Sequence, residues 1–514
     1  MRFFLFLCLA ALGSAVDLTC PKGPIDKSTV TGKFPSDGIA TFPQDFSCGI
    51  QFLIPDGWIV KFVSQSNAVP GVGDQLAIID STNRVNVQAA TGESVFYAPA
   101  NQSWVTISTR TANSQFFFRW QFVDVSSFGK KQMSTGTTLQ LNLSPLNFYQ
   151  FTSPVGPVTF HTADVNNQFD LNLVSIYVYD GDSLTSGKYL GNLWQFTNAD
   201  TMQKSSGKSL VLVNFYAYTT SSYGVANDYD AVSKYSSYRL IMLNDGISFQ
   251  GHVNKPSGPS SSSAVTFLCR DCQEAYLTGL SIIDRNVDDQ LVQFKPATPS
   301  DAYPVLLKYG AKDALDEYLP QQIPTNLFTM TVANCEVSLF LAAGSLATWQ
   351  VPFSGRKGFI YPPSVWNTIA SPNYNTTFTS SDMYTFIFDL DYVEVTQPGQ
   401  KIRIEVGSAG AAPTVVQFSE TTDNPGGRAI NGTYWSTVSS ANSFGMKFEM
   451  KLIDNPTNPT LRPRATTPGP MTFPTVTSPK PTAPGRGEST TMSAAVPFQL
   501  LSLTVIVAKL AMGC

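Results

Sequence analysis

Histidine is nearly absent from this chain, and charged residues are few. The 514 residues include only two histidines, while Asp, Glu, Lys and Arg together make up 14% of the sequence. The formal net charge is −4, whereas a nucleic-acid-binding domain usually carries a basic face. The sequence also lacks a G-x-S-x-G elbow, a zinc-protease helix motif and a P-loop. These absences argue against nucleic-acid binding and against the enzyme classes that use these motifs.

Few of the remaining residues suit catalysis. His161 lies in a segment of alternating polarity, where a surface position or a hydrogen-bonded one is expected, and His252 adjoins a serine-rich stretch. The carboxylates of Asp180 and Asp182 would suit a glycosidase only if they faced each other across a cleft. An Asp-rich turn is the commoner origin of this pattern. We therefore predict no enzymatic activity, no catalytic residue, no cofactor and no metal.

The first residues have the pattern of a secretory signal peptide. Arg2 is followed by an apolar run to Leu12 and then by small residues up to Ala15, and these are the three parts of such a signal. A transmembrane anchor is the alternative, but spanning a bilayer needs about 20 apolar residues and this run is shorter. We predict that residues 1–16 are a signal peptide.

The last residues fit the signal for a glycosylphosphatidylinositol (GPI) anchor. Residues 493–514 form an apolar tail with no basic flank after it, although a single-pass helix usually keeps one. Small and polar residues at 485–491 precede the tail, as the anchor signal requires. We place the lipid near Ser489; a retained helix with Lys509 snorkelling to the interface is the alternative. Residues 456–492 are rich in Thr, Ser and Pro and are predicted to form an extended, disordered stalk.

Seven cysteines fall to five once both terminal segments are removed. An exported chain enters an oxidising compartment, so disulfides are expected, and we pair Cys20 with Cys48. The remaining three cannot all pair within the chain; we expect one of Cys269 and Cys272, and we take Cys272, to join Cys335. The spacing of Cys269 and Cys272 also fits a redox motif or half of a zinc site, but no second pair of ligands lies at metal spacing.

The mature chain is long enough for about two to four domains. Abundant Ser, Thr, Tyr, Phe and Val without helical heptads predict an all-β fold. Strand-like runs separated by turn residues suggest one β-sandwich over residues 17–125 and a second over 140–245. Residues 254–264, rich in Ser and Pro, are predicted to be a linker, and 265–455 to be a third β-rich region. The end of that region resembles the end of the first sandwich, which suggests a divergent repeat over about 335–455; chance similarity between β-rich sequences is the alternative.

Two short apolar stretches that end in Asp carry a resemblance to a known family. Asp74 to Asp80 reads D-Q-L-A-I-I-D, and Ser175 to Gly181 reads S-I-Y-V-Y-D-G. Both resemble the D-Y-L-E-I-R-D-G strand of CUB domains. With its cysteine spacing and the sequence from Pro55 to Trp58, the first sandwich resembles the CUB-like family of secreted nematode proteins. The resemblance implies tandem jelly-roll β-sandwiches, and it implies a role in pathogen-induced innate defence.

Many CUB domains bind Ca²⁺ through three acids on loops at one end, and calcium needs several hard oxygen ligands. Asp74 matches one of these acids, but residues 62–72 contain no Asp or Glu to match the upstream acid. Arg110 lies near the place of the loop acid, and Val174 replaces the strand acid in the second sandwich. We therefore predict no calcium site, with Asp74 and Asp80 closing a strand and a turn instead.

The remaining features point to an exported binding protein. N-glycosylation sequons predict surface positions at Asn101, Asn142, Asn375 and Asn431. Most tryptophans are expected in the sandwich cores; an exposed aromatic platform that stacks on sugars is the alternative. We predict a non-enzymatic binding module at the cell surface or in the extracellular space, anchored to the outer leaflet by a lipid, with protein or glycan partners and a role in innate defence. A glycosylated structural coat or spacer protein without a specific ligand is the first alternative, and a glycan-acting enzyme is the second.

Overall fold

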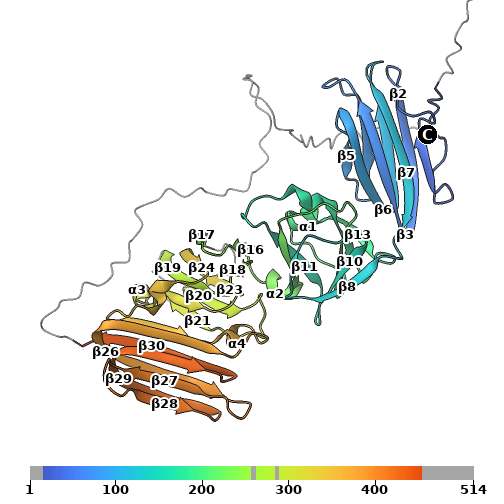
Figure 1. The fold of residues 1–514 in the computed structure, drawn as a ribbon. Coiled ribbons are helices and arrows are strands. Elements are labelled where there is room, and N and C mark those ends of the chain that lie inside the picture. The colour runs from blue at the N-terminus through green and yellow to red at the C-terminus, as the bar shows by residue number, and fades with distance from the viewer. Residues whose placement is uncertain (1–15, 256–261, 284–288, 454–514) are drawn as a thin grey trace, which may run out of the picture. The chain divides into compact units, whose positions relative to one another are not determined.

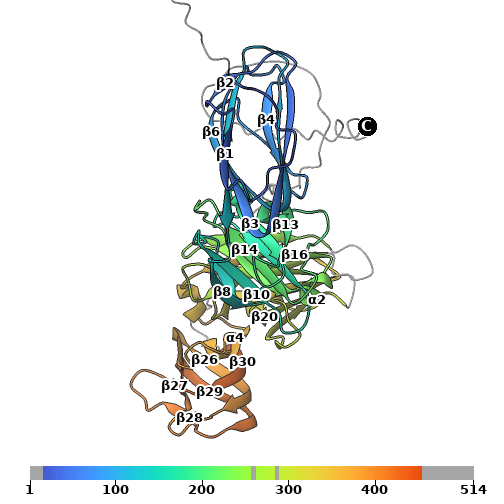
Figure 2. The ribbon, with the colours of Figure 1, turned by 90° about the vertical axis from the view of Figure 1, so that its right-hand side faces the viewer.

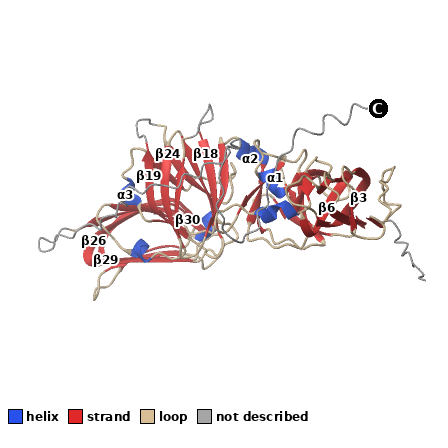
Figure 3. Ribbon diagram, turned by 90° about the horizontal axis from the view of Figure 1, so that it is seen from above, coloured by secondary structure: helices blue, strands red, loops and turns tan. Residues whose placement is uncertain are grey.

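The computed structural model describes residues 16–255, 262–283 and 289–453 (Figure 1). Within these ranges the strands β1–β30 dominate, and the helices are short (Figure 3). The predicted all-β fold is therefore confirmed. No described helix is both long and apolar enough to cross a membrane. The helices are η1 (Leu171–Ser175), α1 (Leu193–Thr197), α2 (Tyr229–Ser233), α3 (Leu315–Tyr318), η2 (Ala347–Gln350) and α4 (Pro363–Trp366).

The first module consists of one seven-stranded sheet that bends into two layers (Figure 2). Its path is β1-β7-β3-β6-β4-β5, with β2 paired to β7. The long strands β3 and β6 pair on both sides of an irregularity between Ile54 and Ile59. Phe52 and Phe62 lie on opposite sides of this bend, and their ring centroids are 4.8 Å apart in the core. The strands are β1 (Thr31–Phe34), β2 (Ala40–Thr41), β3 (Ser47–Asn67), β4 (Gln75–Ile79), β5 (Val85–Val87), β6 (Thr91–Ser108) and β7 (Gln115–Asp124).

The fourth module repeats this topology. Its path, β25-β30-β26-β29-β27-β28, matches β1-β7-β3-β6-β4-β5 strand for strand. The lengths match as well, because β3 and β26 both have 21 residues, β6 and β29 have 18, and β7 and β30 have 10. The strands are β25 (Arg356–Ile360), β26 (Tyr374–Glu394), β27 (Ile402–Gly407), β28 (Thr414–Phe418), β29 (Thr422–Ser439) and β30 (Ser443–Leu452).

The second module pairs a five-stranded sheet, β8-β10-β14-β12-β13, with a three-stranded sheet, β9-β15-β11. In the five-stranded sheet β8 and β10 are parallel. The strands are β8 (Gly129–Ser134), β9 (Thr138–Gln140), β10 (Asn147–Thr152), β11 (Val158–Ala163), β12 (Ile176–Asp180), β13 (Lys188–Asn192), β14 (Ser209–Asn214) and β15 (Tyr223–Asp228).

The third module has the topology of the second. Its sheets are β16-β18-β23-β20-β21, in which β16 and β18 are parallel, and β17-β24-β19 with β22 added at the edge. The chain therefore contains two sandwich topologies, each used twice. The strands are β16 (Ser237–Leu243), β17 (Ser248–Val253), β18 (Ser262–Cys269), β19 (Ala275–Ile283), β20 (Leu291–Pro296), β21 (Leu307–Gly310), β22 (Gln321–Ile323), β23 (Leu327–Ala333) and β24 (Glu336–Ala343).

These sheets place several boundaries differently from the sequence-based prediction. The predicted second sandwich, 140–245, ends with β16, but β16 pairs with β18 and belongs to the third module. The predicted linker, 254–264, is too long, because β18 begins at Ser262. The predicted region 265–455 contains most of the third module and all of the fourth. The end of the first sandwich and the end of region 265–455, which resemble each other in sequence, are β7 and β30. These are the last strands of two modules with the same topology.

Three terminal predictions lie outside the described residues. These are most of the signal peptide at 1–16, the stalk at 456–492 and the tail at 493–514 with the anchor site near Ser489.

Candidate functional site

Asp74, the residue that resembles a calcium ligand, is surrounded by protein hydrogen-bond donors. Its carboxylate accepts from the backbone N–H of Arg110 at 2.5 Å and of Thr111 at 3.2 Å. It also accepts from the hydroxyl of Ser114 at 2.6 Å and from that of Thr111. Burial acts to raise the pKa of Asp74, but these hydrogen bonds outweigh it and hold that pKa below its usual value. The donors occupy the oxygen positions that a calcium ion would need.

In the second module, two loop acids likewise accept hydrogen bonds from protein donors. Ser221 donates to Asp164 at 2.5 Å, Ser222 donates to Asp170 at 2.6 Å, and Thr220 also donates to Asp170. Neither acid stands out in the sequence, where the run Thr220-Ser221-Ser222 is the available signal. No group of three or more His, Cys, Asp or Glu side chains suited to a metal occurs in the described residues.

The residues considered for catalysis are not brought together. Asp180 accepts from the backbone N–H of Ser206 at 2.9 Å, whereas Asp182 accepts from the hydroxyl of Ser186 at 3.5 Å. Asp182 therefore stabilises its own turn, whereas Asp180 holds the end of β12 to the segment that precedes β14. His252 hydrogen-bonds to Ser338 across β17 and β24.

His161 is half-buried and in contact with its neighbours, which fits the expected hydrogen-bonded position rather than the surface one. Its ring lies edge-on to that of Tyr238, with 4.5 Å between centroids, and its Nδ1 is 3.3 Å from Nδ2 of Asn227. Burial lowers the pKa of His161 to about 3, so the imidazole is neutral at pH 7. A base with that pKa is too weak to accept a proton near neutrality, and His161 serves the contact between β11 and β16.

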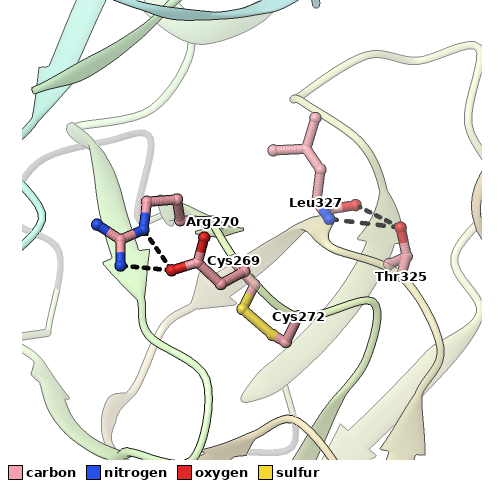
Figure 4. Close-up of a disulfide and its surroundings, with 6 residues drawn as sticks. Cys269, Arg270, Cys272, Thr325 and Leu327 are labelled. Carbon is pink, nitrogen blue, oxygen red and sulfur yellow. Dashed lines mark hydrogen bonds and ion pairs between the residues drawn. A yellow bond between two sulfur atoms is a disulfide. The ribbon is translucent and has the colours of Figure 1, made fainter.

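In the third module the cysteines pair differently from the prediction. Cys20 and Cys48 are joined, with their Cα atoms 5.6 Å apart, but Cys272 is bonded to Cys269 rather than to Cys335 (Figure 4). The reason is the register of β18 and β23, in which Leu268 pairs with Leu327 and Ser262 with Ala333. Cys269 and Cys335 therefore lie at opposite ends of these strands, about 20 Å apart at roughly 3.3 Å per residue.

Cys335 is expected to be an unreactive thiol in the native protein. It is fully buried, and burial raises the pKa of its thiol, so little thiolate forms and little reagent reaches it. We expect iodoacetamide to label Cys335 only after denaturation, and to label neither Cys269 nor Cys272 without a reductant. Peptide mass mapping of native and denatured protein measures both; labelling of Cys335 in the native protein contradicts the structure.

All four sequon asparagines are exposed, as a glycosylation site requires. They occupy the surface of the first, second and fourth modules: Asn101, Asn142, Asn375 and Asn431. Glycosylation at these positions stays a prediction.

Most tryptophans lie in the cores, and one does not. Trp349, Trp366 and Trp435 are at most 2% exposed, whereas Trp104 on β6 is 38% exposed. Trp104 is the only tryptophan among the exposed large apolar residues of the described chain. Among the described tryptophans it is therefore the candidate for stacking on a ligand; the other exposed aromatic residues are Phe169, Tyr218 and Tyr303.

Trp104 lies on the outward side of the layer β5-β4-β6-β3, which we call the outer face of the first module. Strand pairing sets Gln51, Trp104, Ile79 and Val85 side by side in one row. The next row contains Gly49, Thr106, Ala77 and Val87. The alternate residues of these strands, such as Phe52 and Val105, point into the core. The outer face consists of Gly49, Gln51, Leu53, Ala77, Ile79, Val85, Val87, Gln102, Trp104 and Thr106.

The outer face is unusually apolar for a solvent-facing sheet. Val85 is 53% exposed, Val87 49% and Leu53 41%, and none of the ten residues is charged. The corresponding face of the fourth module carries charged as well as apolar side chains. There Arg403 and Glu405 form an ion pair on β27, and β26 carries the exposed sequon residue Asn375. This topology therefore does not itself require an apolar outer face.

Comparison with known proteins places the first module in a family. Residues 15–126 match the CUB-like domain. The CUB-like match covers the module that carries Trp104, and no curated protein matches the chain. The resemblance seen in the sequence is thus confirmed for this module at the level of the domain family.

The solved structures that match this chain share little sequence identity with it. The CUB1-EGF-CUB2 domains of rat MASP-1 are 9% identical, with 62% of this chain and 99% of that one covered and a TM-score of 0.18. The same region of human MASP-1/3 is 12% identical, with 61% and 100% covered and a TM-score of 0.17. The extracellular region of zebrafish Gpr126/Adgrg6 is 10% identical, with 64% and 53% covered and a TM-score of 0.18. TM-scores this low carry no argument about function.

Proposed function

We propose that this protein is a non-enzymatic binding protein of the cell surface or extracellular space that acts in innate defence through a protein or glycan partner. The observation that carries the proposal is the exposed, uncharged outer face of the CUB-like module. Large exposed apolar patches on soluble domains usually mark interaction sites. The two histidines, Asp180 and Asp182 are each engaged in hydrogen bonds or ring contacts within the fold, which supports a binding role over catalysis.

A binding experiment with the whole secreted chain tests this function. The purified chain is immobilised and exposed to extracellular fluid of the source tissue and, separately, to microbial cell-wall polysaccharides. Saturable binding that unlabelled protein competes away is the expected result. A chain that captures nothing saturably from either source favours the alternative, a glycosylated coat or spacer protein without a specific ligand.

The predicted lipid anchor has its own test. We expect phosphatidylinositol-specific phospholipase C to release the protein from intact cells as a glycosylated, soluble form, because the C-terminal sequence has the small residues, spacer and tail of an anchor signal. Immunoblotting of medium and cells measures the release. The Ser489→Pro variant tests the attachment site. Release persists in this variant if the lipid is attached at a neighbouring small residue. Protein that stays with the cells and keeps residues 493–514 in its C-terminal peptide contradicts the anchor.

A further inference from the structure

We propose that the outer face of the first module is a platform for a neutral carbohydrate, with a sugar ring stacked on Trp104. The inference rests on the proposed binding function and names the ligand class and the site. Its support is the placement of one aromatic ring, two amides and an apolar border on a face without charge.

One edge of the Trp104 indole lies near the neighbouring strand, and part of the ring is open to solvent. A Cβ atom added at Gly49 would lie 3.8 Å from Cε3 and 3.9 Å from Cζ3 of Trp104, so the ring lies against the glycine on the neighbouring strand. Because the side chain is 38% exposed, part of the ring is available to solvent. An open aromatic face suits the C–H surface of a pyranose, which is apolar and flat.

A pair of amides borders the ring. Nε2 of Gln51 donates to Oε1 of Gln102 at 3.1 Å, and Gln51 pairs directly with Trp104 across the strands. This bond leaves Oε1 of Gln51 and Nε2 of Gln102 without a partner among the described residues. One free acceptor and one free donor match a sugar hydroxyl, which both donates and accepts.

The absence of charged side chains and the small size of the outer face favour one class of ligand. With no charged side chain on it, the face offers nothing to a sialic acid, a sulfate or a phosphate. The outer face, as defined above by its residues, is smaller than the about 20–30 residues that a stable protein interface uses on each partner. A short neutral oligosaccharide bordered by Leu53, Val85 and Val87 fits this patch better than a protein surface does.

The test compares three forms of the full secreted chain for binding to laminarihexaose, chitohexaose and mannohexaose, with a sialylated trisaccharide as the charged control. Titration calorimetry is expected to show binding of at least one neutral hexasaccharide by the native chain. Trp104→Ser is expected to weaken that binding by at least about tenfold, and Trp104→Phe by less, since it keeps a ring. Val438→Ser, which removes an exposed apolar side chain from the fourth module, is the matched control and is expected to change nothing.

Each outcome decides the proposal. Loss in Trp104→Ser with retention in Trp104→Phe and an unchanged thermal unfolding curve supports it. Equal hexasaccharide binding by Trp104→Ser and the native chain overturns the site but leaves the proposed binding function standing. A saturable protein ligand without any oligosaccharide binding overturns the ligand class alone. If the chain binds neither oligosaccharides nor proteins, the further inference and the proposed function fail together.

Discussion

Replacing Arg356 by alanine is expected to lower the free energy of unfolding of the fourth module by about 3–5 kcal/mol. The Arg356 side chain is fully buried and has no carboxylate partner among the described residues. Its guanidinium instead lies against aromatic rings, with centroids at 4.9 Å for Trp349 and 5.1 Å for Phe378. Alanine would remove this contact and leave a large cavity.

Two backbone carbonyls complete the environment of Arg356. Nη1 donates to the carbonyl of Val351 at 2.6 Å, and Nη2 donates to that of Pro320 at 3.4 Å. Burial lowers the pKa of Arg356 to about 9, so the group remains a cation at pH 7, and a desolvated cation over aromatic rings contributes about 2 kcal/mol or more. Nε has no partner, which is a cost that the rings and carbonyls must offset.

Hydrogen exchange measured by mass spectrometry locates the effect. Peptides from β25 to β30 are expected to exchange faster in Arg356→Ala, while those of the first module are unchanged. Arg356→Met keeps most of the volume and is expected to cost less, about 1 kcal/mol for each carbonyl that loses its donor. The control is Arg403→Ala in the same module: its side chain is 43% exposed, and a surface ion pair contributes less than about 1 kcal/mol. Equal exchange in Arg356→Ala and the native chain would mean that the buried cation gives no net stability.

Local patterns predicted the strands well because each strand is half-buried. Lys401 to Val406 alternates between polar and apolar residues, and β27 alternates between buried and half-buried ones. Pro55-Asp56-Gly57 predicts a turn, yet these residues continue β3 through its bend, with Gly57 at φ +79°. A turn sequence in a long strand produces a bulge when pairing continues on both sides. Only the partner strands decide whether such a sequence forms a turn or a bulge.

Long-range pairing is what the sequence did not reveal. The strand at Ser237–Leu243 looked like the end of the second sandwich, because its parallel partner, β18, lies beyond a serine-rich stretch. The predicted disulfide between Cys272 and Cys335 was wrong for the same reason, since the register of two strands sets which cysteines meet. The candidate site depends on register as well: Trp104 was visible as an aromatic residue, but its position beside Gln51 and over Gly49 follows from the pairing of β3 with β6.

Acid is expected to destabilise the contact of β11 with β16, with His161 as the responsible group. The folded-state pKa of about 3 lies below the usual 6.5, so protonation is disfavoured in the folded state. Above pH 6.5 neither state binds the proton and stability is complete. Below pH 6.5 the unfolded chain becomes protonated and the folded chain does not, so the free energy of unfolding falls by about 1.4 kcal/mol per pH unit until the pH approaches 3.

The His161→Gln variant isolates this effect from the carboxylates, which also titrate in acid. Between pH 6.5 and pH 4, urea unfolding is expected to show a loss for the native chain about 3 kcal/mol greater than for His161→Gln. The partner ring cannot compensate, because burial raises the pKa of Tyr238 to about 12 and the phenol stays neutral. His252→Gln removes the other histidine, which hydrogen-bonds to Ser338 and lies 3.1 Å from Glu336, and comparison with it shows how much of the change is specific to His161. Parallel profiles for the native chain and His161→Gln would show that the imidazole is protonated in the folded protein, and that the contact with Tyr238 tolerates the charge.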